Sequence, residues 1–508
     1  MITLKKIAAM RYAVCALLAV CLCVLVGCGE KPTEESVFDQ GRPDATKPYK
    51  TPAKTEAQIE AETKAFAEYK AKAEAGDAKR QYNLGGWYEI GDGVPQDHNE
   101  AVKWYRKAAE QGHVSAQYNL GLMYANSEGV LQDYQEARKW YRKAAEQGHI
   151  SAQYNLGMIY HKGEGVEKDS KEAVKWWQKA ADQGVAYAQY ALGVVYHKGE
   201  GVEKDSKKAV KWLQKAADQR LAYAQSDLGF LYQNGEGVAQ DFKEALRLYR
   251  LGVNQGDASA QNNLGLMYAN GTGVLQDHKE AVKWYRKAAE QEYVYAQHNL
   301  GFMYSSGHGV LQDHKEAVKW YRKAAEQGLA GAQTNLGLMY ANGTGVLQDH
   351  KEAVKWYRKA AEQEYVNAQH NLGVSYERGQ GVEQDFRKAV KWYRKAAQQG
   401  YPGAQHNLGV FYVLGRGVLE DYVTAYAWLN IAAANGYEAS MKGKPDIAQK
   451  MTLEQIAKAQ ELSREMLKQI EANIAGKPKE PDFRLIAPRI DPKTGLPIWE
   501  TKNPKLLK

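Results

Sequence analysis

Cysteine is the scarcest reactive side chain in this protein. The 508-residue chain has only four cysteines, and all of them stand within the first 28 positions: Cys15, Cys21, Cys23 and Cys28. The body of the chain therefore has no thiol for a disulfide framework, a cysteine nucleophile or a thiolate metal cage. Its stability must come from packing alone.

A hydrophobic run long enough to cross a membrane is also missing. The apolar run Tyr12–Gly27 has 16 residues, fewer than the roughly 20 that a spanning helix needs. It follows a basic start that contains Lys5, Lys6 and Arg11. This combination is typical of a signal peptide. Residues 1–27 are therefore predicted to be a signal peptide, and the rest of the chain is predicted to be exported.

The apolar run ends in Leu25-Val26-Gly27-Cys28, which resembles the lipobox of bacterial lipoproteins. That resemblance implies cleavage before Cys28 and attachment of lipid to its thiol. The resemblance to sorted lipoproteins also implies, from Gly29 rather than Asp at the next position, the outer membrane rather than the inner membrane, with the protein either periplasmic or surface-exposed. The alternative is an uncleaved anchor or a plain secreted protein in which Cys28 is incidental.

Proline is almost absent from the middle of the chain and concentrates at its ends. The prolines that precede the body are Pro32, Pro43, Pro48 and Pro52, and those that follow it are Pro478, Pro481, Pro488, Pro492, Pro497 and Pro504. Between the first group stand mainly polar and charged residues, which bury little surface. Residues 28–53 are therefore predicted to be a disordered tether, and residues 476–508 a proline-rich tail that is irregular or extended.

No strong charge of either sign marks the chain. Three of its 68 Lys and Arg residues belong to the predicted signal peptide, which leaves 65 cations against 60 anions and a net charge of +5. This mild excess does not indicate nucleic acid, and no nucleic-acid partner is expected. Phenylalanine is also scarce: there are 8 Phe against 34 Tyr and 12 Trp, so most aromatic rings carry a polar group that suits half-exposed interfaces.

One period governs the middle of the chain. A Leu-Gly pair recurs every 36 residues, beginning at positions 84, 120, 156, 192, 228, 264, 300, 336, 372 and 408. Residues 263–294 even recur letter for letter at 335–366. Such a period is the signature of a repeat architecture and leaves no room for inserted domains.

Each repeat has the pattern of a helical hairpin. In the copy around residue 264, Ala260, Leu264 and Tyr268 follow at i, i+4 and i+8 and predict one apolar helical stripe. Gly265 beside them leaves room for a close neighbour. The segment Asn270–Gly273 breaks the pattern, because glycine admits the positive φ of a turn. We call this first element helix A.

A second helix, helix B, is predicted to begin after Asp277. A short carboxylate caps free N–H groups, and Glu280 three residues later completes a pair like a capping box. Aspartate stands at this place in all ten copies, at positions 97, 133, 169, 205, 241, 277, 313, 349, 385 and 421. The buried side of the helix is predicted to carry Ala281, Trp284, Tyr285, Ala288 and Ala289.

A single hairpin cannot bury both of its aromatic faces, so successive copies must pack on one another. The letters A-x-x-x-L-G-x-x-Y, then G-x-G-V-x-x-D, then A-x-x-W-Y-x-x-A-A-x-x-G resemble the Sel-one-like repeat, a relative of the tetratricopeptide repeat. The predicted fold is all-α: a solenoid, forming a right-handed superhelix, of ten 36-residue hairpins. Repeats are expected over residues 77–436, with a capping helix at 54–76 and a capping region at 437–475.

Some positions depart from the repeat pattern. Ser127 replaces the first loop glycine, and Leu248 replaces the tryptophan of helix B. Arg220, Glu292 and Glu364 replace the glycine expected after helix B. Because glycine tolerates a positive φ and other residues do not, these last three joints are expected to differ in geometry from the others.

Binding residues are sought where the copies differ. In tetratricopeptide repeats the outward positions of helix A line a groove that holds peptides, and the resemblance implies the same here. Large aromatic side chains are good anchors. The residues predicted to line the groove are Tyr82, Tyr118, Tyr154, Tyr190, Phe230, His298, Phe302, His370 and His406. The alternative is that the tyrosines only cover neighbouring helices as outer core.

The resemblance implies an adaptor, so the expected protein is a cell-envelope lipoprotein, monomeric, that binds a protein or peptide and attaches to the membrane through its lipid. No catalytic residue, cofactor or metal site is predicted. One alternative is a β-lactam-binding or β-lactam-hydrolysing enzyme, as in a cysteine-rich branch of the family. Another is a binder of cell-wall polymer or anionic lipid, through the Lys and Arg side chains on the outer face of helix B.

Overall fold

The computed structural model describes residues 56–476, 489–490 and 497–498. The chain divides into two units, residues 1–66 and 67–508. The predicted signal peptide, Cys28 and the tether lie outside the described residues, as does nearly all of the tail, and those predictions stay predictions. Within the described ranges, no helix is both long and apolar enough to cross a membrane.

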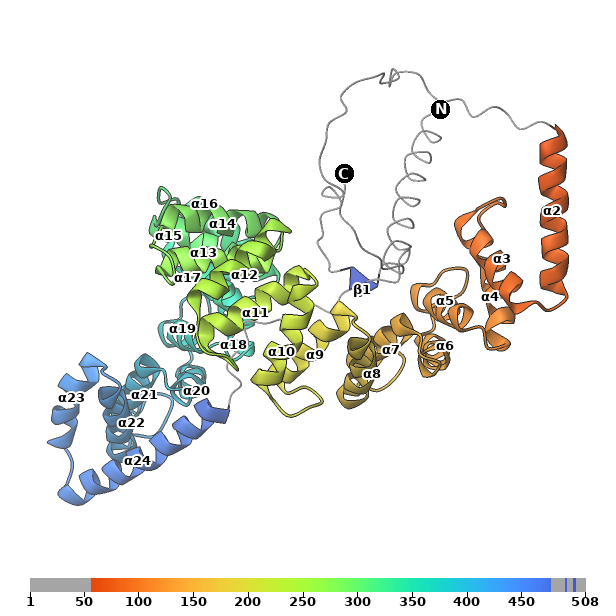
Figure 1. The fold of residues 1–508 in the computed structure, drawn as a ribbon. Coiled ribbons are helices and arrows are strands. Elements are labelled where there is room, and N and C mark those ends of the chain that lie inside the picture. Colours follow the sequence, from red (N-terminus) through yellow and green to blue (C-terminus); the bar gives the residue numbers. More distant parts are fainter. Residues whose placement is uncertain (1–55, 477–488, 491–496, 499–508) are drawn as a thin grey trace. The chain divides into compact units, whose positions relative to one another are not determined.

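The described residues form helices α2–α24 and one short strand pair (Figure 1). Ten helices are the first of a hairpin: α3 (Ala78–Ile90), α5 (Val114–Asn126), α7 (Ile150–Lys162), α9 (Ala186–Lys198), α11 (Ala222–Asn234), α13 (Ala258–Asn270), α15 (Val294–Ser306), α17 (Ala330–Asn342), α19 (Val366–Arg378) and α21 (Pro402–Leu414). Their partners are α4 (His98–Glu110), α6 (Tyr134–Glu146), α8 (Ser170–Asp182), α10 (Ser206–Asp218), α12 (Phe242–Asn254), α14 (His278–Glu290), α16 (His314–Glu326), α18 (His350–Glu362), α20 (Phe386–Ala397) and α22 (Tyr422–Ala434). The prediction of an all-α solenoid of helical hairpins is confirmed.

Further helices flank the ten repeats, which we number 1–10 from α3–α4 to α21–α22. Helix α2 (Glu56–Glu74) precedes them, and Tyr69 of α2 packs against Trp87 of α3 with ring centroids 4.4 Å apart and the rings tilted at 43°. Helices α23 (Glu438–Ala448) and α24 (Leu453–Gly476) follow, and α24 packs on α22. Strands β1 (Arg489–Ile490) and β2 (Pro497–Ile498) pair antiparallel.

Aspartate caps helix B in all ten repeats, as predicted. In repeat 6, Oδ1 of Asp277 accepts hydrogen bonds from the N–H groups of Lys279 and Glu280, at 2.9 and 3.1 Å. The capping-box part of the prediction is wrong, because the Asp277 N–H donates instead to the carbonyl of Tyr268 in helix A, at 2.9 Å. The glutamate is then free to pair with a lysine one turn later, 3.1 Å away in the case of Glu280 and Lys283.

A glycine of helix A and a large side chain of helix B set the spacing within each hairpin. A Cβ atom added to Gly265 would lie only 2.7 Å from Cε1 of Tyr285. The same approach recurs in every repeat, with Trp177, Leu213 or Leu429 in place of tyrosine in three of them. The room that Gly265 leaves is therefore used inside its own hairpin, not at the joint with the next one.

The joint between repeats depends on a different glycine, the second one of the loop between helix A and helix B. Gly309 of repeat 7 has a φ of 71°, and a Cβ there would lie 2.2 Å from the backbone oxygen of His278, at the start of α14. The loop of one repeat thus rests directly on helix B of the preceding repeat. The side chain of Arg286 adds a second link, because Nη2 donates to the hydroxyl of Tyr304 at 2.7 Å.

A buried row of glutamines forms a third link along the array. In repeat 7, Nε2 of Gln297 donates to the carbonyl of Ala289 in the preceding repeat, at 3.3 Å. Oε1 of Gln297 accepts from Nε2 of Gln327, at the end of its own hairpin, at 2.8 Å. Gln297 is buried, and a buried amide is costly unless it is bonded in this way. Glutamine recurs here every 36 residues, at the same position of helix A in all ten repeats.

The joints that lack a glycine after helix B are not built differently, contrary to expectation. Arg220, Glu292 and Glu364 have φ values of 63°, 63° and 62°, within the left-handed region that the glycines of the other joints occupy. Space permits a side chain there, since a Cβ at Gly328, the equivalent glycine of repeat 7, would meet no atom within 4 Å. Only the backbone strain of about 1–2 kcal/mol remains.

We predict that Gly309→Ala destabilises the array more than Gly93→Ala. Both glycines have a positive φ, 71° and 73°, so both substitutions strain the backbone equally. Gly93 belongs to repeat 1, and a Cβ there meets no atom, whereas at Gly309 it meets backbone. The extra loss of unfolding free energy should be about 1–3 kcal/mol, measured by chemical denaturation. Equal losses for the two variants would contradict this account of the joint.

Candidate functional site

The first candidates are the tyrosines and histidines predicted to line a groove on helix A. Tyr154 and Tyr190 are each only 5% exposed, so they cannot offer their rings to a partner, and the groove prediction is wrong for these two. Tyr154 packs near Tyr187 of the next repeat, with ring centroids 6.3 Å apart. The hydroxyl of Tyr190 donates to Oδ2 of Asp227, also in the next repeat, at 3.0 Å.

Tyr82 and Tyr118 are half-buried and stack on histidines of the following repeat. Tyr82 lies 4.6 Å from His113, and Tyr118 lies 4.4 Å from His149, measured between ring centroids. Nδ1 of His113 accepts a hydrogen bond from the N–H of Ala116 at 3.3 Å and so caps α5. Desolvation by burial lowers the pKa of both histidines, which favours the neutral form that can accept this bond.

The three predicted histidines make similar links. Nε2 of His298 lies 3.1 Å from the side-chain amide of Asn335, and Nε2 of His370 lies 3.4 Å from that of Asn407. Nδ1 of His406 lies 2.8 Å from the hydroxyl of Ser440. Burial lowers the pKa of all three imidazoles. The described part of the chain contains no group of three or more His, Cys, Asp or Glu side chains placed to hold a metal ion.

This row of side chains therefore forms a seam between adjacent helix-A elements. Each ring or polar group contacts the next repeat, which is the outer-core role weighed against the groove. The half-buried members keep one accessible edge, and their part in binding stays a prediction. The seam joins neighbouring repeats.

The second row on helix A is more accessible in the middle of the array. Phe302 is 51% exposed and Leu338 is 38% exposed. Phe230 and Leu266 occupy the same position in repeats 5 and 6 and are half-buried. We call Phe230, Leu266, Phe302 and Leu338 the apolar strip; they stand on α11, α13, α15 and α17, the helix-A elements of four consecutive repeats. Phe230 and Phe302 were predicted site residues, whereas Leu266 and Leu338 were not.

Two histidines lie beside the strip, of which His308 is exposed and His278 is half-buried. His308 is exposed, and its ring lies 6.1 Å from that of Phe302 and 5.1 Å from that of His278, between centroids. His308 stands in the loop of repeat 7, where repeats 6 and 8 carry threonine. An aromatic ring flanked by imidazoles offers both apolar contact and hydrogen bonds, the combination that protein interfaces favour.

A buried carboxylate pair occupies the joint between repeats 5 and 6. Asp227 stands where eight other repeats have asparagine, and it accepts the bond from Tyr190 described above. Asp257 caps α13, where its Oδ1 accepts a hydrogen bond from the N–H of Ala260 at 2.7 Å. Desolvation by burial raises the pKa of Asp227 well above its ordinary value and raises the pKa of Asp257 to about 6. The nearby charge of Asp257 raises the pKa of Asp227 further.

Other groups face this pair from the elements packed around it. Tyr223 of α11 and Tyr293 before α15 both lie within electrostatic range of Asp257, and Lys198 at the end of α9 partly offsets the effect on Asp227. Helices α11 and α13 contact each other directly here. The joint therefore encloses two carboxyl groups that favour their protonated forms.

We predict that this joint weakens as the pH rises. Below about pH 4 the carboxyl groups are protonated in both folded and unfolded chains, but above it the unfolded chain releases protons that the folded joint retains. The resulting loss of stability continues at least to about pH 6, the pKa of Asp257. Asp227→Asn should remove most of this loss. We expect the variant's free energy of unfolding to exceed that of the parent by about 1–3 kcal/mol at pH 7.5, and we expect this difference to disappear near pH 4.

Chemical denaturation over this pH range measures the effect. Asp218→Asn is the control, because Asp218 is an exposed carboxylate at the end of α10. The expected result is that the Asp218 variant follows the parent at every pH. A gain for Asp227→Asn that is the same at pH 4 and pH 7.5 would show that the carboxyl group does not titrate as described.

The fold and the strip define an α-solenoid of helical hairpins whose helix-A face carries accessible apolar side chains. The family model described as Sel1 repeat matches all ten hairpins, at residues 81–113, 114–149, 150–185, 186–221, 222–257, 258–293, 294–329, 330–365, 366–401 and 402–437. The chain belongs to the Sel1 repeat family. Sel1 repeats generally mediate protein–protein interaction, and their solenoids are typically non-catalytic scaffolds.

Solved structures of similar proteins include two with substantial sequence identity. The chain is 36% identical to c5321, a protective antigen present in uropathogenic Escherichia coli strains, over 82% of this chain and 98% of that one, with a TM-score of 0.48. It is 34% identical to a Sel1 repeat protein from Oxalobacter formigenes, over 66% of this chain and 96% of that one, with a TM-score of 0.50. A comparison with curated proteins gives no match.

Proposed function

We propose that this protein is a lipid-anchored scaffold of the bacterial cell envelope that binds a protein or peptide through the apolar strip. The observation that carries the proposal is the exposure of Phe302 and Leu338, large apolar side chains on adjacent helix-A elements. Exposed apolar groups in a row mark an interaction site better than scattered ones do. The half-buried Phe230 and Leu266 extend the row over two further repeats.

The strip is suited to an extended or helical segment rather than to a small molecule. Its members come from four successive repeats, so a ligand that contacts all of them must run along the array. The imidazole of His308 beside Phe302 supplies a polar contact at one edge. A central apolar anchor with a polar rim is the usual anatomy of a protein interface.

We predict that a photo-crosslinking residue at position 302 captures a partner in intact cells, whereas the same residue at position 311 does not. Leu311 is the matched control, because it is 91% exposed in the loop of the same repeat but lies outside the strip. With the captured partner in hand, Phe302→Ser should weaken binding about tenfold or more, the loss typical of an anchor residue. Capture of the same proteins from both positions would contradict a specific role for the strip.

Attachment to the membrane rests on the leader and on Cys28. We predict that Cys28→Ser abolishes the incorporation of a labelled fatty acid and releases the protein from the membrane fraction, because lipid chains provide the anchor. Cys23→Ser is the control and should leave both properties unchanged. Fatty-acid labelling that persists in the Cys28 variant would rule out this anchor.

The two alternatives have less support. The enzyme alternative rests on a cysteine-rich branch of the family. It has less support because this chain has no cysteine after Cys28. Polymer or lipid binding through helix B needs free cations, but many of these cations are engaged within their own helix. Lys283 pairs with Glu280 at 3.1 Å, and Lys287 lies 4.4 Å from the centre of the Trp284 ring.

A further inference from the structure

Helix α20 differs in charge from α18, the helix B of the preceding repeat. The preceding helix, α18, carries Glu352 and Glu362, and at the equivalent positions of repeat 9 stand Lys388 and Gln398. Helix α20 therefore contains five cations and no anion, a charge of +5, whereas α18 contains four cations and two anions, a charge of +2. Over their first twelve residues, the two helices differ otherwise only in His350 against Phe386 and Lys351 against Arg387.

A third change adds to the same place. The residue between the two loop glycines is Arg416 in repeat 10, whereas it is glutamate in repeats 2–5 and uncharged in repeats 6–9 apart from His308. The guanidinium of Arg416 lies 5.6 Å from the centre of the Phe386 ring, at the start of α20. Three independent substitutions thus make the region around α20 more positive.

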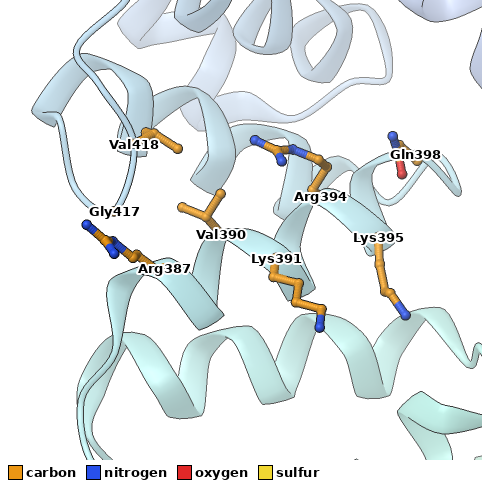
Figure 2. Close-up of a pocket in the computed structure, with 8 residues that line it drawn as sticks. All are labelled: Arg387, Val390, Lys391, Arg394, Lys395, Gln398, Gly417 and Val418. Carbon is orange, nitrogen blue, oxygen red and sulfur yellow. The ribbon is translucent and has the colours of Figure 1, made fainter.

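A shallow hollow lies beside these changes: Gln398 lines it, and Lys388 and Arg416 are next in sequence to its lining residues Arg387 and Gly417. It has a volume of about 360 Å³ and lies between α20 and the loop at Gly417–Val418 (Figure 2). Val390 and Val418 provide an apolar floor, and Arg387, Lys391 and Arg394 stand around it. Figure 2 shows Arg394 extending to one side of the helix, whereas Lys391 and Lys395 extend together to the other.

The cations of the hollow differ in their contacts, and Lys395 lies 5.0 Å from the centre of the Trp392 ring. Among the described residues, Arg387, Lys391 and Lys395 form no ion pair with a carboxylate, and all three are exposed. Lys355, the counterpart of Lys391 in α18, pairs with Glu352 at 2.7 Å. Arg394 is engaged, because it donates to the hydroxyl of Tyr412 at 3.0 Å. Exposed and unneutralised cations above an apolar floor are complementary to an anionic ligand.

We infer that this hollow, formed by Arg387, Val390, Lys391, Arg394 and Val418, binds an acidic segment of a protein partner. Arg387 and Lys391 are four residues apart, a rise of about 6 Å along the helix. Alternate side chains of an extended peptide project to one side about 6.6–6.8 Å apart, so two acidic residues separated by one other residue match the two cations. An apolar side chain of the same peptide can contact Val390 and Val418.

The width of the charged region favours a peptide over a membrane. A bilayer surface would contact several helices at once, but the neighbouring helices are much less positive: α18 has a charge of +2, and α22 contains no charged residue. The excess charge is confined to one helix and one loop. A narrow anionic ligand fits such a surface better than the flat surface of a bilayer does.

The hollow is distinct from the apolar strip, so this inference goes beyond the proposed function and can fail independently of it. The strip lies on helix A of repeats 5–8, whereas the hollow uses helix B of repeat 9 and the loop of repeat 10. Variants of one surface leave the side chains of the other unchanged.

The test uses the full chain and a fluorescent peptide of alternating glutamate and alanine, with binding measured by fluorescence anisotropy. The variant is Arg387→Gln with Lys391→Gln, and the matched control is Lys351→Gln with Lys355→Gln at the equivalent positions of α18. We expect the α20 variant to weaken peptide binding at least about tenfold and the α18 variant less than about twofold. Thermal unfolding of both variants confirms that the array remains folded.

Two further probes distinguish an acidic peptide from a lipid surface as the ligand of the hollow. A peptide with glutamine in place of glutamate should not bind, and vesicles that contain phosphatidylglycerol should bind both variants equally well. Equal weakening by the two double variants would overturn the inference, because the peptide would then be sensing overall charge. Vesicle binding that depends on Arg387 and Lys391, without peptide binding, would assign the hollow to lipid and also overturn it.

Discussion

The close approach of helix A to helix B at a glycine is the contact on which the rest of the array depends. A tyrosine, tryptophan or leucine of helix B lies where the Cβ of any other residue would stand, as Tyr285 does against Gly265. This contact fixes the distance between the two helices, and with it the faces that each hairpin presents to its neighbours. The joints between repeats follow from that geometry, because each loop glycine and each buried glutamine must meet the preceding hairpin in the same way.

Much of the fold could be predicted because it depends on local chemistry. The aspartate caps act within a few residues, and the 36-residue spacing of Leu-Gly pairs places every hairpin. The errors arose where a side chain had a choice between local and distant partners. The Asp277 N–H bonds to helix A instead of to Glu280, and Glu292 adopts the glycine conformation because nothing obstructs its side chain.

The candidate site was harder to predict because burial on helix A depends on how the next repeat packs. Tyr154 and Phe302 both stand on faces that the helical period leaves outside the core of their own hairpin. Only the contacts with the following repeat distinguish the two side chains, because these contacts bury Tyr154 but leave half of Phe302 exposed. A single sequence cannot show which of two outward rows becomes the seam, and this is why the buried tyrosines were mistaken for a groove.

The two verbatim segments, 263–294 and 335–366, are about one hairpin long and begin two hairpins apart. Because each hairpin meets its neighbours through the same glycine, glutamine and arginine contacts, a pair of hairpins in this region can be copied or lost by recombination without leaving a mismatched joint. A change in the number of hairpins in this region would therefore leave the contacts at the joints intact. The joint that holds Asp227 and Asp257 differs, because Asp227 stands where the other repeats carry asparagine or alanine. A hairpin copied or lost there would change the groups that are buried with it.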